Sequence, residues 1–104
     1  MFTRNVMFTR NKAIELFRQQ WQDMQHDLGD NPSEFDRNLY KAIWCREHTP
    51  GYTIINACYL CEYTANNCKK CPIDWNDKNC YSGKVDYRTS PISEILALPE
   101  RKIL

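Results

Sequence analysis

Two closely spaced cysteine pairs constrain the fold of this chain more than any other feature. Cys58 and Cys61 form one C-x2-C unit, Cys68 and Cys71 form a second, and six residues separate the two units. A C-x2-C turn directs two thiolates towards one point, which is the arrangement that a tetrahedral metal ion requires. Cys80 follows nine residues after Cys71. We therefore expect a structural zinc ion bound by four cysteine thiolates.

Three other uses of these cysteines are weighed against zinc. A disulfide framework needs an oxidising compartment, and the N-terminal residues contain no apolar core typical of a secretion signal. A thiol–disulfide redox motif usually begins a helix beside a strand of a parallel sheet, and the sequence predicts no such unit. An iron–sulfur cluster also uses four cysteines, and the spacing does not exclude it. Zinc is the interpretation that the spacing favours.

The choice of the four ligands is open among five cysteines. Pro72 follows Cys71 directly and favours an extended backbone at Cys71, so the second turn cannot copy a regular zinc knuckle. Our first choice of ligands is Cys58, Cys61, Cys68 and Cys71, with Cys80 as the substitute for Cys68 or Cys71. A cysteine left out of the site is expected to pack as a small buried apolar residue.

Helices are predicted on both sides of the cysteine-rich stretch. Apolar residues recur at helical spacing from residue 12 to residue 28, with a cap at Thr9 or Asn11 and Gly29 at the end. A second helix is predicted from a cap at Asn31 to about His48. Its expected inner face is Phe35, Leu39, Ala42 and Ile43, flanked by Tyr40 and Trp44.

The remaining segments complete one small domain. Residues 52–56 are β-prone and are expected to lead into the metal site as an extended segment. Ser90 and Pro91 begin a short last helix whose apolar stripe is Ile92, Ile95 and Leu96. We expect a small α-rich domain over residues 8–101, a helical hairpin packed on a cysteine-liganded zinc knuckle. Residues 1–7 and 102–104 are expected to be flexible.

The order of these motifs resembles a group of small bacteriophage and prophage proteins. Residues 9–16 and Trp21 are similar to their opening helix, and the strings Cys58-Tyr-Leu-Cys-Glu-Tyr63 and Cys68-Lys-Lys-Cys-Pro-Ile-Asp-Trp75 followed by Cys80 resemble their cysteine motif. Residues 95–101 resemble their closing helix, whereas residues 31–49 depart in detail. The resemblance implies a phage origin and a metal-organised fold, and a location in the cytoplasm of an infected bacterium. It implies no reaction.

The sequence gives little support to an enzyme. Cys45 and His48 lie three residues apart on the predicted second helix and could form a nucleophile and base, but they equally fit a core thiol and a helix-end histidine. Four or five available thiolates favour a closed metal site, without the open position that a catalytic zinc keeps. We expect a binding protein that is not an enzyme and that carries no membrane span.

Two kinds of partner are considered. The net charge is only +1, and residues 21–40 carry five acidic residues and one basic residue, so a nucleic-acid clamp is the less favoured reading. The chain has thirteen aromatic residues, more than a helix pair and a knuckle easily bury. We expect an accessory protein that inhibits a host or phage protein, such as a defence or nucleic-acid enzyme. The alternative is a regulatory nucleic-acid-binding zinc module. The candidate partner-binding residues are Tyr59, Lys69, Lys70 and Trp75.

Overall fold

Helix α1 (Arg10–Leu28) is the central element of the molecule. The computed structural model describes residues 8–76 and 79–102, so the ends expected to be flexible, 1–7 and 102–104, lie outside it except for Lys102. The side chain of Thr9 caps α1 by accepting a hydrogen bond from the backbone N–H of Lys12, and Gly29 ends the helix with a φ of 83°. Both features are as predicted, since a left-handed residue after a helix favours glycine.

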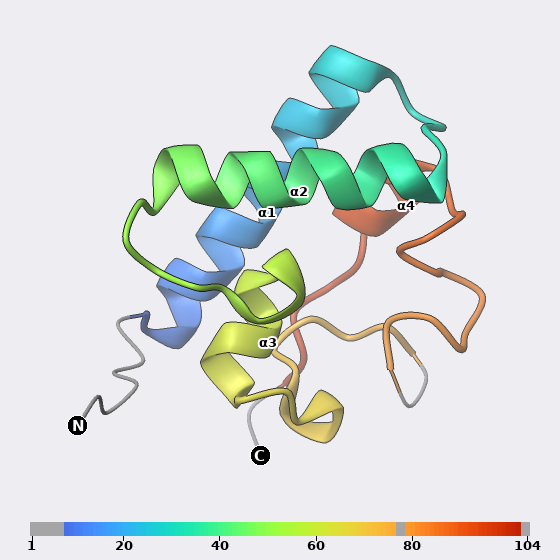
Figure 1. The fold of residues 1–104 in the computed structure, drawn as a ribbon. Coiled ribbons are helices and arrows are strands. Elements are labelled where there is room, and N and C mark those ends of the chain that lie inside the picture. Colours follow the sequence, from blue (N-terminus) through green and yellow to red (C-terminus); the bar gives the residue numbers. More distant parts are fainter. Residues whose placement is uncertain (1–7, 77–78, 103–104) are drawn as a thin grey trace.

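One face of α1 builds the main core. Its buried side chains Ile14, Phe17, Trp21 and Met24 pack with Leu60 of α3 (Tyr59–Thr64), with Ile73 and Trp75, and with Ile92 and Ile95 of α4 (Ile92–Leu96). Figure 1 shows α1 running through the molecule, with α3 beside its first half and α4 near its second half. The predicted stripe is confirmed except at its last member, because Leu28 is exposed.

Helix α2 (Glu34–His48) crosses α1 (Figure 1) and turns an unexpected face towards it. Its cap is Ser33, whose hydroxyl accepts from the backbone N–H of Asp36, so the helix begins two residues later than a cap at Asn31 predicts. The predicted inner face is wrong. The inward residues are Arg37, Lys41, Trp44 and Cys45, whereas Phe35, Leu39 and Ile43 are exposed by 73%, 49% and 38%.

The cysteine-rich part of the chain is built from short helical turns. The expected extended segment has no regular structure at residues 52–54 and then forms the 3-10 turn η1 (Ile55–Ala57). Helix α3 and a second 3-10 turn, η2 (Cys68–Lys70), follow. Within the described residues the β-pairing is a single isolated bridge between Ile73 and Glu100. The fold is therefore α-rich, as predicted.

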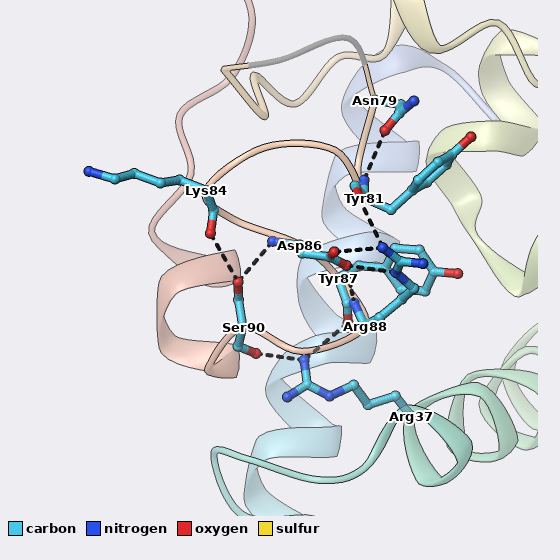
Figure 2. Close-up of polar contacts among 8 residues, drawn as sticks. All are labelled: Arg37, Asn79, Tyr81, Lys84, Asp86, Tyr87, Arg88 and Ser90. Atoms are coloured by element: carbon cyan, nitrogen blue, oxygen red, sulfur yellow. Dashed lines mark hydrogen bonds and ion pairs between the residues drawn. The ribbon is translucent and has the colours of Figure 1, made fainter.

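Arg37 fastens the segment after the cysteines to α2. Its guanidinium donates to the carbonyl oxygens of Tyr87 at 3.0 Å and Ser90 at 2.6 Å, as Figure 2 shows, and its Nε donates to that of Pro32 at 2.9 Å. Only 1% of Arg37 is exposed. The hydroxyl of Ser90 accepts from the backbone N–H of Asp86, and α4 begins after Pro91. Ser90 therefore braces the loop before α4 and does not cap the helix as predicted.

No helix in the described ranges is long and apolar enough to cross a membrane.

Candidate metal centre

All five clustered cysteines line one cavity. It has a volume of about 740 Å³ and lies between α1, α3 and the chain that follows them. Phe17, Trp21 and Trp75 form part of its wall. The cysteines that line it are Cys58, Cys61, Cys68, Cys71 and Cys80. The structure thus brings together every cysteine that the sequence assigned to a metal site.

The first pair is placed by the start of α3. Cys58 occupies the cap position with an extended backbone, and Cys61 lies within the helix one turn later. Asn56 precedes the pair with a φ of 54°, a left-handed conformation that asparagine tolerates better than most residues. Its amide donates to the side-chain oxygen of Asn66 at 3.3 Å. This bond ties the chain before α3 to the chain after it, so both cysteines face the cavity from a fixed turn.

The second pair is placed by η2 and by Pro72. The side chain of Asn67 accepts a hydrogen bond from the backbone N–H of Lys69 and caps the turn that contains Cys68. Cys71 has a φ of −56° and a ψ of 128°, the extended geometry that the following proline predicts. The Nε of Arg101 donates to the carbonyl oxygen of Cys71 at 2.8 Å and holds this end of the pair.

The five thiols share a cavity without forming a closed coordination site. Within residues 8–76 and 79–102, no group of three or more cysteine, histidine, aspartate or glutamate side chains lies in position to hold a metal ion. The donor set is nevertheless the soft thiolate set that zinc or an iron–sulfur cluster takes. Coordination by four of these thiols therefore requires the two cysteine turns and Cys80 to draw together across the cavity.

The thiols differ in how readily they ionise. A hydrogen bond from the Cys61 thiol lowers the pKa of Cys58, and the nearby Lys41 ammonium lowers it further. The same hydrogen bond raises the pKa of Cys61, and burial raises the pKa of Cys80 to about 12. Of these three thiols, Cys58 therefore ionises most readily. Because a metal binds thiolates, loading the site releases protons from the other cysteines.

The first cysteine pair has two features of redox motifs. Cys58 lies at the start of a helix, and the pKa of its thiol is lowered. The parallel sheet that usually accompanies such motifs is not found among the described residues, where the single bridge is antiparallel. The position of the pair alone does not make it a redox centre.

Cys45 and His48 each make contacts with other residues of the fold. Cys45 is buried and accepts a hydrogen bond from the Gln20 amide at 3.4 Å. The ring of His48 stacks on Trp44 at 3.7 Å, and its Nδ1 lies 2.9 Å from the Trp44 carbonyl oxygen. Cys45 therefore contacts Gln20, whereas His48 packs on Trp44.

Cys45 is expected to resist alkylation. Burial raises the pKa of its thiol, so its thiolate forms only above the range of an ordinary cysteine and is shielded from reagent. With iodoacetamide at pH 8 and metal present, mass spectrometry of the peptides should show Cys45 unmodified until the protein is denatured. Modification of Cys45 in the folded protein as fast as that of a free thiol would contradict this description.

Two of the four candidate partner-binding residues lie inside the protein. Tyr59 and Trp75 are exposed by 0% and 3%, because both pack in hydrophobic clusters. They are therefore not available to stack on a base or contact a partner. Lys69 and Lys70 are exposed, as a partner-binding role requires.

The cations at the cavity are ones that sequence reasoning missed. Lys41 and Arg101 line it, whereas the exposed Lys69 and Lys70 do not. Lys41 is distant in sequence from the five clustered cysteines. The one sequence feature that could have placed it at the cavity is its position on the same face of the helix as Arg37 and Trp44. The apolar residues on the opposite face have the spacing of a buried stripe, so that face was predicted to point inwards instead.

No protein-family model, curated protein or solved structure matches this chain.

Proposed function

We propose that this chain is a phage-encoded, zinc-stabilised accessory protein that binds and inhibits a host or phage protein in the cytoplasm of an infected bacterium. A defence enzyme or a nucleic-acid enzyme is the kind of target we favour. The five thiols around one cavity support the zinc ion, and the resemblance of the cysteine string to phage proteins supports the origin. The observation that carries the binding role is the exposed apolar stripe of α2.

The stripe consists of Phe35, Leu39 and Ile43. These residues follow one another at intervals of four, so they lie on one face of the helix. Among the residues that the structure describes, Phe35 is the most exposed large apolar side chain, at 73%. An amphipathic helix normally turns such a stripe to the core, but α2 turns Arg37, Lys41, Trp44 and Cys45 inwards. A contiguous exposed apolar stripe is typical of a protein-binding surface.

An acidic hollow adjoins the stripe and indicates the chemistry of the partner. It has a volume of about 410 Å³, shares Ile43 with the stripe, and contains the carboxylates of Asp23, Asp27 and Glu47. The Tyr40 hydroxyl donates to Asp27 at 2.5 Å and lowers the pKa of that carboxyl, which favours its charged form. The surface therefore suits a protein segment with apolar side chains for the stripe and a basic side chain for the hollow.

A pair of double variants tests the binding role. Leu39→Asp with Ile43→Asp should leave folding intact, because both side chains are exposed, and should weaken partner binding about a hundredfold or more. Lys69→Glu with Lys70→Glu is the matched control and should bind as the wild type does. The partner is identified by affinity enrichment from bacterial lysate, and its affinity for the purified variants is measured by calorimetry. Equal affinity of wild type and the stripe variant for that partner would overturn the binding role.

The alternative is a nucleic-acid-binding zinc module with a regulatory role. The exposed Lys69 and Lys70, together with Tyr81 exposed by 49%, favour it. Two of its expected stacking residues, Tyr59 and Trp75, are buried, which leaves it the weaker proposal. The same variants separate the two functions. If the alternative holds, the lysine pair abolishes RNA or DNA binding, the stripe variant does not, and binding falls steeply with salt.

A further inference from the structure

Lys41 is a buried cation that lies at the cysteine cavity. It projects from the inner face of α2, and only 5% of it is exposed. It lines the cavity, and its Nζ lies 4.7 Å from the ring centroid of Tyr87, which lines the cavity too. The Gln20 amide donates to the Lys41 carbonyl oxygen at 3.2 Å and fixes the helix backbone at this point. Among residues 8–76 and 79–102 no carboxylate forms an ion pair with Lys41.

A buried ammonium requires a compensating negative charge. Removing it from water is costly, and the face of one tyrosine ring offsets only part of that cost. The groups at this cavity that can become anionic include the five cysteine thiols. A divalent metal ion bound by four thiolates carries a net charge of −2. Among the residues that the structure describes, the cations of the cavity wall are Lys41 and Arg101, which together supply +2.

We propose that Lys41 is the counter-cation of a metal–thiolate centre formed in this cavity, and so couples α2 to the cysteine turns. The inference rests on the proposed zinc binding. The coupling has a direct consequence for the proposed partner surface. The face of α2 opposite Lys41 carries Phe35, Leu39 and Ile43, so loading of the metal fixes the helix that presents the stripe.

The test is a metal titration of four proteins: wild type, Lys41→Met, Lys41→Arg and Lys69→Met. Lys69 neighbours Cys68 in sequence but is exposed, so Lys69→Met removes the same charge from the surface as a matched control. Co²⁺ reports thiolate ligation through its charge-transfer and visible bands, and Zn²⁺ affinity is measured in competition with a chromophoric chelator. We expect Lys41→Met to lower Zn²⁺ affinity about 10- to 100-fold, the range found for residues that support metal ligands. Lys41→Arg and Lys69→Met should stay close to wild type.

The outcomes separate this inference from the proposed function. If the wild type shows no thiolate bands and binds no Zn²⁺, the metal site itself is wrong. If the wild type binds and Lys41→Met binds equally well, the site stands and the role of Lys41 is wrong. If Lys41→Met fails to fold even with excess Zn²⁺, Lys41→Gln, which keeps a polar end without the charge, carries the same comparison. Equal losses in Lys41→Met and Lys69→Met would point to a general charge effect and overturn the inference.

Discussion

Chelating the metal is expected to unfold the cysteine half of this protein, residues 52–90. This half has few aliphatic side chains of its own, and its cysteine turns are short and irregular. Structural zinc binds small peptides with about 10–16 kcal/mol, which matches or exceeds the net stability of about 5–15 kcal/mol of a typical domain. Losing the metal therefore removes enough free energy to unfold the segments that hold it. Hydrogen exchange with and without a strong chelator measures the effect residue by residue.

Cysteine variants provide the matched control for chelation. In the double variant Cys58→Ser with Cys61→Ser, the backbone amides of residues 52–90 should exchange as fast as in the chelated wild type, even when zinc is present. Cys45→Ala should keep the wild-type response to chelator, because Cys45 does not line the cavity. Unchanged protection of residues 52–90 after complete metal removal would contradict a structural role for the metal.

Replacing Arg37 is expected to have the second-largest effect on stability. Arg37→Leu should lower the free energy of unfolding by about 3–5 kcal/mol, since it leaves one buried and two partly buried carbonyl oxygens without their charged donor. Those oxygens belong to Pro32, Tyr87 and Ser90, so the substitution also releases the loop before α4 from α2. Urea unfolding in zinc-saturated buffer measures the change.

Arg88 is the natural comparison for Arg37 in the same network. Its guanidinium pairs with Asp86 at 2.9 Å, but the side chain is 39% exposed, and Figure 2 shows it away from the α2 contact. Arg88→Leu should cost no more than about 1 kcal/mol, as exposed ion pairs do. Similar losses for the two variants would mean that the buried carbonyl contacts of Arg37 contribute nothing particular.

Hydrophobic periodicity predicted α1 well and α2 badly, for one physical reason. It finds a helix and its apolar face, but it cannot tell a face that packs on the core from a face left for a partner. Phe35, Leu39 and Ile43 have the spacing of a core stripe and are exposed. On the inward face of α2, Arg37 donates hydrogen bonds to backbone carbonyl oxygens, and Lys41 lines the cysteine cavity.

The sequence predicted which cysteines form the candidate site, but it did not predict which other residues surround them. The spacing of the cysteines indicated a site built from four of the five clustered cysteines, and all five line one cavity. Pro72 correctly indicated an extended Cys71. The placement of Lys41 and Arg101 at that cavity depends on tertiary contacts between segments far apart in sequence, and no local pattern carries that information.

The metal content of the protein tests the central claim most directly. Untagged protein is purified without added metal and examined by native mass spectrometry and elemental analysis. The account predicts one zinc ion per chain, released when the pH is lowered and the thiolates take up protons. A metal-free chain whose clustered cysteines are free thiols, or are paired as disulfides, would contradict it.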